Sequence, residues 1–379
     1  MKSLRLTAVG AALGLAVLMG AGPSHAADQT PADILQAGAR QGVADGYPGV
    51  IGLVRQGDSV ERVQAGVGAV GSKVPADPKA QFRIGSNTKA FTATVLLQLE
   101  SEHRLSLDDS VARWLPGSVG ANGYDGAKIT IRQLLNHTSG LPDYVNSPQI
   151  SAPYAVNANV RQSYPPQTLV DLALSLRKPV SAPGEKFSYA NTNYVLAGMV
   201  IRAVTGSDPA SEVQKRIIEP LGLHDTTFPT EDPALYGNYL HGYVHPVVFY
   251  TQDVTVSNVQ LFWSAGAMVS TLDDLAAFTR ALLSGRLLPP TQTNELKTTV
   301  PANSDGSVEY GLGIQHVRTP CGKWAWGHNG AVIGYFSFWL SDEDGTKQVM
   351  EANNEFHLLA PTPGQTHTSS AATNAYCAL

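Results

Sequence analysis

The chain has 379 residues, of which 43% are hydrophobic and 15% are charged, and its formal net charge is −5. This balance predicts a folded protein with a large core and excludes a mainly disordered chain, while the negative charge argues against nucleic acid or an anionic membrane surface as a partner. The ten histidines are scattered, the two cysteines cannot complete a zinc site alone, and no Gly-rich phosphate loop is present, so we expect neither a metal nor a cofactor.

The first 26 residues have the pattern of a secretory signal peptide. Lys2 and Arg5 form a basic start, residues 6–22 are apolar and small, and Ser24-His25-Ala26 is a small-residue cleavage signature. We therefore expect removal of residues 1–26 and a secreted, extracellular protein. An uncleaved N-terminal anchor is the alternative. No later segment is apolar for long enough to cross a bilayer, so we expect no membrane span after processing.

The mature chain opens with a helix and a hairpin. Thr30 followed by Pro31 is a helix start signal, and the predicted helix runs to about Ala44. Residues 49–56 and 59–67 are predicted strands, joined by a turn at Gly57-Asp58.

A serine and a lysine lie three residues apart where the next helical pattern begins. Ser86 follows an apolar extended run, and Lys89 would share a helix face with it. A lysine whose pKa is lowered by burial can remove the serine proton, and a helix N-terminus offers N–H groups to an oxyanion. The spacing by itself is weak, because Ser175 and Lys178 repeat it where the basic end of a helix is expected.

A helical middle separates the first strands from a strand-rich end. Residues 130–133 form a capping box, and residues 270–274 cap a further helix. Between them lie short helical patterns and loops rich in Pro, Asn and Tyr. Short strands are predicted beyond the second helix, over residues 310–317, 323–326, 334–340 and 348–352.

These elements predict an α/β (α+β) fold. An antiparallel sheet would form from N- and C-terminal segments, flanked by helices, and a mostly helical lobe would be inserted. The catalytic domain would span residues 29–379, with a sheet lobe over about 29–85 and 265–379 and a helical lobe over about 86–264. We expect the site in the cleft between the lobes.

Two further motifs follow Ser86 in chain order. In Tyr189-Ala190-Asn191 the tyrosine could relay a proton, and the asparagine could bond both a lysine and a substrate amide. The triplets at 144–146 and 236–238 share this pattern and are expected to be loops.

The second motif is Gly327-His328-Asn329-Gly330, after the strand predicted at 323–326. Its glycines would let a substrate approach the strand edge, and His328 would offer a donor or a positive charge beside the lysine. A purely structural histidine is the alternative.

With these three motifs in order, the chain resembles the serine penicillin-recognising enzymes, in the branch of class C β-lactamases and D-alanyl-D-alanine carboxypeptidases, and especially secreted DD-carboxypeptidases. Further matching segments are Phe82-Arg83-Ile84-Gly85, Ile131-Arg132-Gln133-Leu134-Leu135, His137-Thr138-Ser139-Gly140-Leu141, Ser264-Ala265-Gly266-Ala267 and Tyr310-Gly311-Leu312-Gly313. The resemblance covers nearly the whole mature chain and implies a β-lactamase/DD-peptidase-like fold.

The resemblance also implies roles for individual residues. Ser86 would be the nucleophile that forms an acyl-enzyme, Lys89 its base and Tyr189 the proton relay. Asn191 would position the lysine and the substrate, and His328 would complete the catalytic set. The backbone N–H groups of Ser86 and Ala331 would form the oxyanion hole, and the substrate would contact Asn329, Gly330 and Gln315.

The two cysteines, Cys321 and Cys377, are expected to form one disulfide in an exported protein, with two free buried thiols as the alternative. The family's C-terminal helix is weakened here by Pro361, Pro363 and Gly364, so we expect that segment to be partly loop.

Departures from the family pattern shape the expected substrate. Carboxypeptidase relatives carry an arginine for the substrate carboxylate where this chain has Gln315, and Arg318 would lie on the opposite strand face. They carry threonine at the positions of Asn329 and Ala331. We therefore expect a serine hydrolase for D-configured peptides, amides or esters, in which the Asn329 amide meets a neutral group.

Three alternatives remain open. They are a strict D-alanyl-D-alanine carboxypeptidase, a class C-like β-lactamase (although lysine usually stands where His328 is) and a non-catalytic penicillin-binding module. The expected partners are a small peptide, amide or ester substrate, with a cell-wall stem peptide as one candidate, and β-lactams as inhibitors. We expect a monomer.

Overall fold

The computed structural model describes residues 29–247, 250–356 and 362–379. The predicted signal peptide lies outside these residues.

An eight-stranded antiparallel sheet forms the centre of the molecule, in the order β2-β1-β12-β11-β10-β9-β8-β7. Strand β1 pairs with β12, so the N-terminal hairpin joins strands from the end of the chain. The predicted fold class is confirmed. The strands are β1 Gly49–Gln56, β2 Ser59–Gly66, β7 Val300–Pro301, β8 Val308–Tyr310, β9 Gln315–Arg318, β10 Trp324–Val332, β11 Tyr335–Ser341 and β12 Lys347–Asn353. Two small sheets pair β3 Phe82–Arg83 with β6 Val269–Ser270 and β4 Tyr243–Val247 with β5 Tyr250–Asp253.

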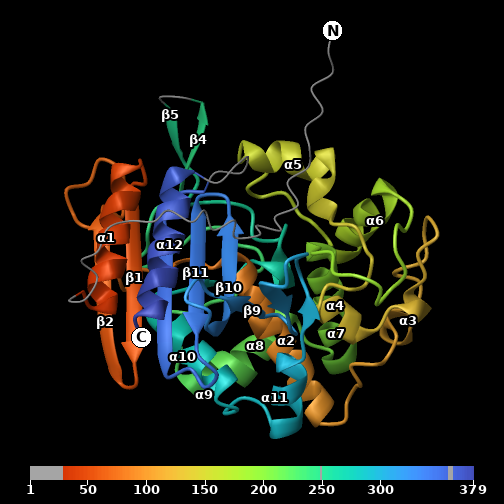
Figure 1. Cartoon of the computed structure of the whole chain (residues 1–379). Helices are drawn as coiled ribbons and strands as arrows, with labels where there is room; N and C mark the ends of the chain where they lie inside the picture. The colour runs from red at the N-terminus through yellow and green to blue at the C-terminus, as the bar shows by residue number, and fades with distance from the viewer. Residues whose placement is uncertain (1–28, 248–249, 357–361) are drawn as a thin grey trace.

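Helices cover the sheet in layers (Figure 1). Helices α1 and α12 lie side by side on one face, and α10 contacts β1 and β12 from the other. Helices α3 to α7 gather beyond β9. The described α-helices are α1 Pro31–Ala44, α2 Thr88–Ser101, α3 Val111–Trp114, α4 Ile131–Leu135, α5 Pro148–Ala155, α6 Pro166–Leu176, α7 Asn191–Thr205, α8 Pro209–Val213, α9 Glu219–Leu221, α10 Leu272–Leu283, α11 Pro290–Lys297 and α12 Pro363–Cys377. The boundaries of the two predicted lobes stay a prediction.

Helix α2 runs through the core. Its residues from Thr88 to Leu97 are all buried, which is typical of a central helix rather than a surface helix with one apolar face. Lys89, in its first turn, is therefore held away from water.

Local sequence signals were correct where they involve caps and tight turns. Thr30 caps α1 in a capping box, Thr130 does the same for α4, and β1 and β2 form the predicted hairpin. Helix α6 ends at Leu176, so Arg177 and Lys178 follow the helix instead of forming its last turn.

Three expectations about strands and the C-terminus were wrong. Strand β10 continues to Val332 and includes the Gly327–Gly330 motif, because the register with β11 persists that far. The predicted strand 310–317 is two strands, β8 and β9, separated by a turn in which Gly313 has a φ of +85°. From Pro363 onward the C-terminal segment is helical, because Pro363 occupies the first helical position and the Thr362 hydroxyl caps the turn, while Pro361 lies outside the described residues.

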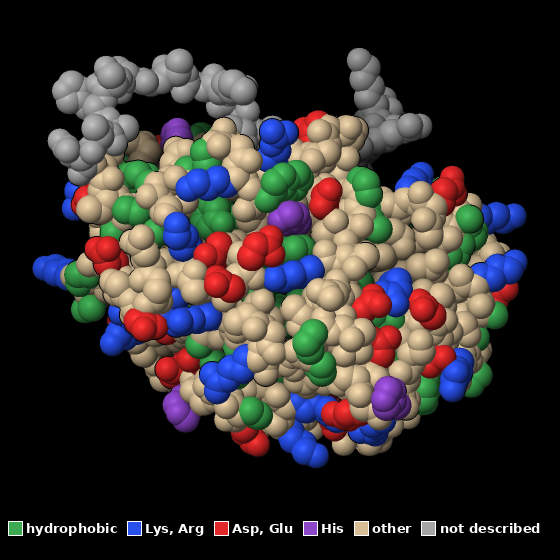
Figure 2. Space-filling model, turned by 60° about the horizontal axis from the view of Figure 1, so that its bottom comes forward, with side chains coloured by type: hydrophobic (Ala, Val, Ile, Leu, Met, Phe, Trp, Pro, Cys, Tyr) green, Lys and Arg blue, Asp and Glu red, His purple; other side chains and the backbone are tan. Residues whose placement is uncertain are grey.

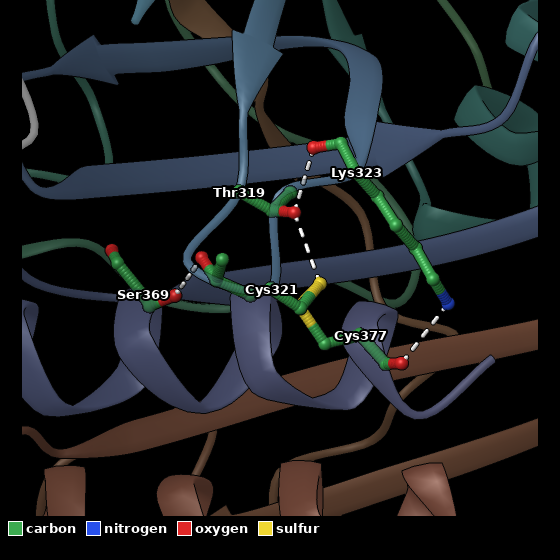
Figure 3. Close-up of a disulfide and its surroundings, with 6 residues drawn as sticks. Thr319, Cys321, Lys323, Ser369 and Cys377 are labelled. Atoms are coloured by element: carbon green, nitrogen blue, oxygen red, sulfur yellow. Dashed lines mark hydrogen bonds between the residues drawn. A yellow bond between two sulfur atoms is a disulfide. The ribbon is translucent and has the colours of Figure 1, made fainter.

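A disulfide ties the end of α12 to the β9–β10 turn (Figure 3). Cys321 and Cys377 are bonded across 56 residues of chain, as predicted. Lys323 strengthens the same corner by donating to the Cys377 carbonyl oxygen over 3.1 Å.

Charges of both signs are interspersed over the face in Figure 2, so that face offers no extended basic surface to a polyanion. In the described part of the chain, no helix has the length and apolarity that a bilayer crossing requires.

Candidate active site

A tight turn between β3 and α2 places Ser86 against strand β10. The turn is the 3-10 segment Gly85–Asn87, and Gly85 has a φ of +51°. A Cβ on Gly85 would lie 2.7 Å from the backbone nitrogen of Ala331, and one on Gly330 would collide with the Ile84 carbonyl. Both glycines are therefore needed for the close approach of turn and strand.

Two side chains meet at the Ser86 hydroxyl, and Ser86 is partly exposed. Lys89 Nζ lies 3.0 Å from Ser86 Oγ, and the Tyr189 hydroxyl donates to the same oxygen over 2.8 Å. The structure thus brings together the serine, the lysine and the tyrosine that the sequence singled out.

The environment of Lys89 favours a neutral amine. The side chain is 0% exposed, and burial lowers its pKa to about 7, although the carboxyl of Asp143 opposes this shift. Besides Ser86 Oγ, Nζ contacts the Asn191 Oδ1 and Ala265 carbonyl oxygens, each at 2.8 Å. Both oxygens can only accept, so a neutral Lys89 amine donates its two N–H groups to them. The lone pair of the amine is then free to accept the hydroxyl proton of Ser86.

Tyr189 is held in its protonated form, because burial raises the pKa of its hydroxyl well above the ordinary value. Its hydroxyl can therefore donate a proton to Ser86 Oγ or to a group bound there, but it does not act as a phenolate base.

Asn191, at the start of α7, is oriented by a residue that sequence reasoning missed. Its Nδ2 donates to Asp143 Oδ2 over 3.0 Å, which turns Oδ1 toward Lys89. Burial raises the pKa of the Asp143 carboxyl. Asp143 caps the 3-10 turn at Tyr144, so the expectation that residues 144–146 form a loop was wrong. The triplet at Tyr236 does lie in an exposed loop.

The edge of β10 beside the serine is open. Pairing with β9 ends at Gly327 opposite Gln315, so the strand from His328 onward has no β9 neighbour. The Lys323 carbonyl oxygen accepts from the Thr319 N–H, so the backbone polar groups of Lys323 point to the β9 side of β10. Every second residue along the strand points its N–H and carbonyl groups to that same side. By that alternation, the Ala331 N–H points to the open edge, toward the Ser86 turn. The Ala331 N–H therefore lies at the edge that the turn before Ser86 approaches, and its partnership with the Ser86 N–H in an oxyanion hole stays a prediction.

His328 is neutral and engaged on both ring nitrogens. Nδ1 lies 2.6 Å from the Asn329 carbonyl oxygen, which can only accept, so Nδ1 carries the proton and Nε2 accepts from the Tyr310 hydroxyl over 2.9 Å. Burial and the charge of Lys89 lower the pKa of His328 to about 3. Of the roles considered for His328, a positive charge or a free donor does not fit this ring.

The predicted substrate contacts lie on neighbouring strands. Asn329 and Gln315 are partly exposed, while Arg318 is exposed and three residues further along β9. An odd separation places Gln315 and Arg318 on opposite faces of the strand.

Other residues missed from the sequence are Tyr310, the Ala265 carbonyl and His137. All three belong to segments that carried the family resemblance, but a backbone oxygen or a buried ring has no signal of its own in one sequence. Among the described residues, no group of three or more His, Cys, Asp or Glu side chains could hold a metal ion.

Comparisons with known proteins identify the family of the chain. The family model described as Beta-lactamase matches residues 29–350. A penicillin-binding protein of Bacillus subtilis is 27% identical over 322 residues, which are 82% of this chain and 68% of that protein. Protein flp of Staphylococcus aureus is 36% identical over 160 residues, and this match spans only 30% of its length.

Two solved structures are similar over most of their length. A D-stereospecific amidohydrolase from Streptomyces sp. has a TM-score of 0.81 and 39% identity, covering 88% of this chain and 95% of that one. A D-amino acid amidase from Ochrobactrum anthropi SV3, solved with L-phenylalanine, has a TM-score of 0.78 and 29% identity, covering 91% and 98%. The chain therefore belongs to the beta-lactamase family and is a serine hydrolase of the penicillin-recognising type.

Proposed function

We propose that this protein is a secreted, D-stereospecific amidohydrolase that acts through an acyl-enzyme on Ser86. The observation that carries the proposal is the position of Ser86 Oγ, which lies between the Lys89 amine and the Tyr189 hydroxyl at the open edge of β10.

The proposed reaction begins with attack of Ser86 Oγ on the substrate carbonyl carbon. Lys89 takes the serine proton on its lone pair, and the backbone N–H groups of Ser86 and Ala331 stabilise the oxyanion. The leaving nitrogen departs with the proton of the Tyr189 hydroxyl, which Lys89 restores. Water then hydrolyses the ester on Ser86, with the same groups moving its proton.

The strand edge favours a neutral amide over a free carboxylate. Asn329 offers an uncharged amide, Gln315 is uncharged, and Arg318 lies on the other face of β9. Loss of a charge-assisted bond to a carboxylate costs about 1.5–3 kcal/mol, roughly ten- to a hundredfold in binding. The names of the Streptomyces and Ochrobactrum proteins support the same substrate class.

A panel of matched substrates tests the proposal. Each D-amino acid amide is compared with its L-enantiomer, and each D-configured peptide amide with the peptide that ends in free D-alanine. We expect kcat/KM to favour D over L and amide over free acid. Higher values for the free acid would favour the carboxypeptidase alternative, and rapid clearance of a chromogenic cephalosporin would favour a β-lactamase.

A Gln315→Arg variant sharpens the same test, because it returns a cation to the strand edge. We expect the free-acid peptide to gain roughly tenfold in kcat/KM relative to its amide. An unchanged ratio would show that this position does not meet the substrate terminus.

Secretion is tested on its own. We expect the protein in the culture medium to begin after Ala26 by N-terminal sequencing. Intact protein retained in the membrane fraction would instead support an uncleaved anchor.

A further inference from the structure

The Tyr189 hydroxyl must keep its place at Ser86, yet Tyr189 lies outside regular secondary structure. The helix that follows, α7, begins only at Asn191, and Ala190 before it is extended, with a φ of −150°. A catalytic side chain on such a segment needs support from elsewhere, since a displacement of about 1 Å can reduce a rate a hundredfold.

One residue, His137, supplies this support on three sides. Its carbonyl oxygen accepts from the Ser188 N–H over 2.8 Å, and its Nδ1 accepts from the Ala190 N–H over 3.2 Å. Its ring packs against the Tyr189 ring with centroids 4.2 Å apart at 31°. The residues before and after Tyr189, and the Tyr189 ring itself, therefore all contact His137.

The hydrogen bonds define the state of the His137 ring. The Ala190 backbone can only donate, so Nδ1 is unprotonated and the proton sits on Nε2. Asn193 Nδ2 lies 3.0 Å from the same Nδ1, and its amide is oriented by the Ser139 hydroxyl, which donates to Asn193 Oδ1. Nε2 is buried and has no hydrogen-bond partner among the described residues.

His137 does not itself take part in the chemistry. It is 0% exposed, and burial together with the charge of Lys89 lowers the pKa of its ring well below the ordinary value. The ring is thus a neutral support behind Tyr189, at the side away from solvent.

We propose that His137 is the positioning residue for Tyr189, which it holds against Ser86 through the Ser188 and Ala190 backbone and through ring contact. This inference rests on the proposed function, in which Tyr189 protonates the leaving group.

A double-mutant cycle on the full mature chain tests the proposal. His137→Phe keeps a ring but removes the acceptor, and His137→Asn keeps an acceptor but removes the ring. With a D-amino acid amide we expect His137→Phe to lower kcat roughly ten- to a hundredfold with KM nearly unchanged, and His137→Asn to retain more activity. In a Tyr189→Phe background, we expect either change to lower kcat less than twofold further.

His103 provides a matched control, because it is an exposed histidine with the same φ of 59° as His137. His103→Phe places the same side chain in the same backbone conformation, and we expect it to leave kcat unchanged. Losses that multiply in the double variant, or an unchanged kcat in both His137 variants, would overturn the proposal.

A structural readout separates this proposal from the proposed function. In crystals of His137→Asn, or of His137→Phe where it folds, we expect the Tyr189 hydroxyl to move away from Ser86 Oγ. An unmoved hydroxyl overturns the positioning role whether or not the substrate class is right. A wild-type enzyme that hydrolyses no amide, and whose Ser86 no fluorophosphonate labels, contradicts the proposed function instead.

Discussion

Burial brings two side chains, on opposite sides of the sheet, to the same pKa of about 7. The pKa of Lys89, in the core beside the open edge of β10, is lowered from 10.5. The pKa of Glu351, beneath α12, is raised from 4.5. Lys89 has three hydrogen-bond partners, one of which is the partly exposed Ser86 hydroxyl. Glu351 is 1% exposed, its Oε1 accepts from Asn353, and the Thr368 side chain of α12 lies against its carboxyl.

The comparison shows that a strongly shifted pKa does not by itself identify a catalytic group. The difference lies in access and in partners, because Lys89 can pass a proton to an atom that a substrate can reach. Glu351 is enclosed between β12 and α12, so we expect its titration to affect the free energy of unfolding and not the rate. We therefore expect changes near Lys89 to alter rates and changes near Glu351 and α12 to alter stability.

The largest expected effect is on the Lys89 side. Ser86→Ala removes the nucleophile, so we expect turnover to fall at least roughly a thousandfold with an unchanged melting temperature. Ser175→Ala is the matched control, because Ser175 also lies three residues before a lysine. The Ser175 hydroxyl donates to the Leu172 carbonyl oxygen. Retained turnover in Ser86→Ala would defeat the assignment of the nucleophile.

The next effect is on the α12 side. Replacing Cys321 and Cys377 together with serine frees the end of α12, and the chain-entropy model for a loop of 56 residues predicts a loss of about 4 kcal/mol in the free energy of unfolding. Urea titration measures this loss. We expect kcat to stay within about twofold, and a large fall in kcat under native conditions would mean that the two sides are coupled.

A smaller effect is expected from Glu351→Gln. The folded protein holds the Glu351 proton more tightly than the unfolded chain, so this group favours folding below its unfolded pKa of 4.5, and that contribution is lost as pH rises through about 7. The glutamine variant lacks this loss. At pH 8 we expect it to be more stable than the wild type by on the order of 3 kcal/mol. The urea unfolding midpoints of the two proteins are compared at pH 4 and pH 8. A wild-type protein that is more stable than the variant at pH 8 would contradict the prediction.

The smallest effect separates the two titrations. Only neutral Lys89 can accept the Ser86 proton, so we expect kcat/KM to fall about tenfold for each pH unit below about 7. Glu351→Gln should leave this acidic limb in place. If the fall in kcat/KM below pH 7 disappears in the Glu351→Gln variant, the kinetic pKa belongs to Glu351 and not to Lys89.

Local signals in the sequence went far toward both the fold and the site. Thr30, Thr130 and the Gly57-Asp58 turn were sufficient to predict their elements, because caps and turns depend on neighbours a few residues away. For the C-terminal helix the same reasoning was wrong, because we expected Pro363 to interrupt the helix. A proline in the first helical turn, after a capping threonine, is compatible with a helix.

Residues that act by supporting others could not be predicted in this way. Asp143 and His137 carry no motif for their contacts with Asn191 and Tyr189, which lie about 50 residues further along the chain. Only the packing of the turns after α4 against the start of α7 brings them together.

The sequence by itself determined which side chains are available for the chemistry: a serine and a lysine one helical turn apart, followed in order by a tyrosine with an asparagine and by a glycine-flanked histidine. The tertiary structure decided their charge states and directions. The pKa of Lys89 is about 7 and His328 is neutral, because segments from across the chain exclude water around both side chains. The cost of that desolvation depends on every atom that surrounds a group, and most of those atoms are far from it in sequence.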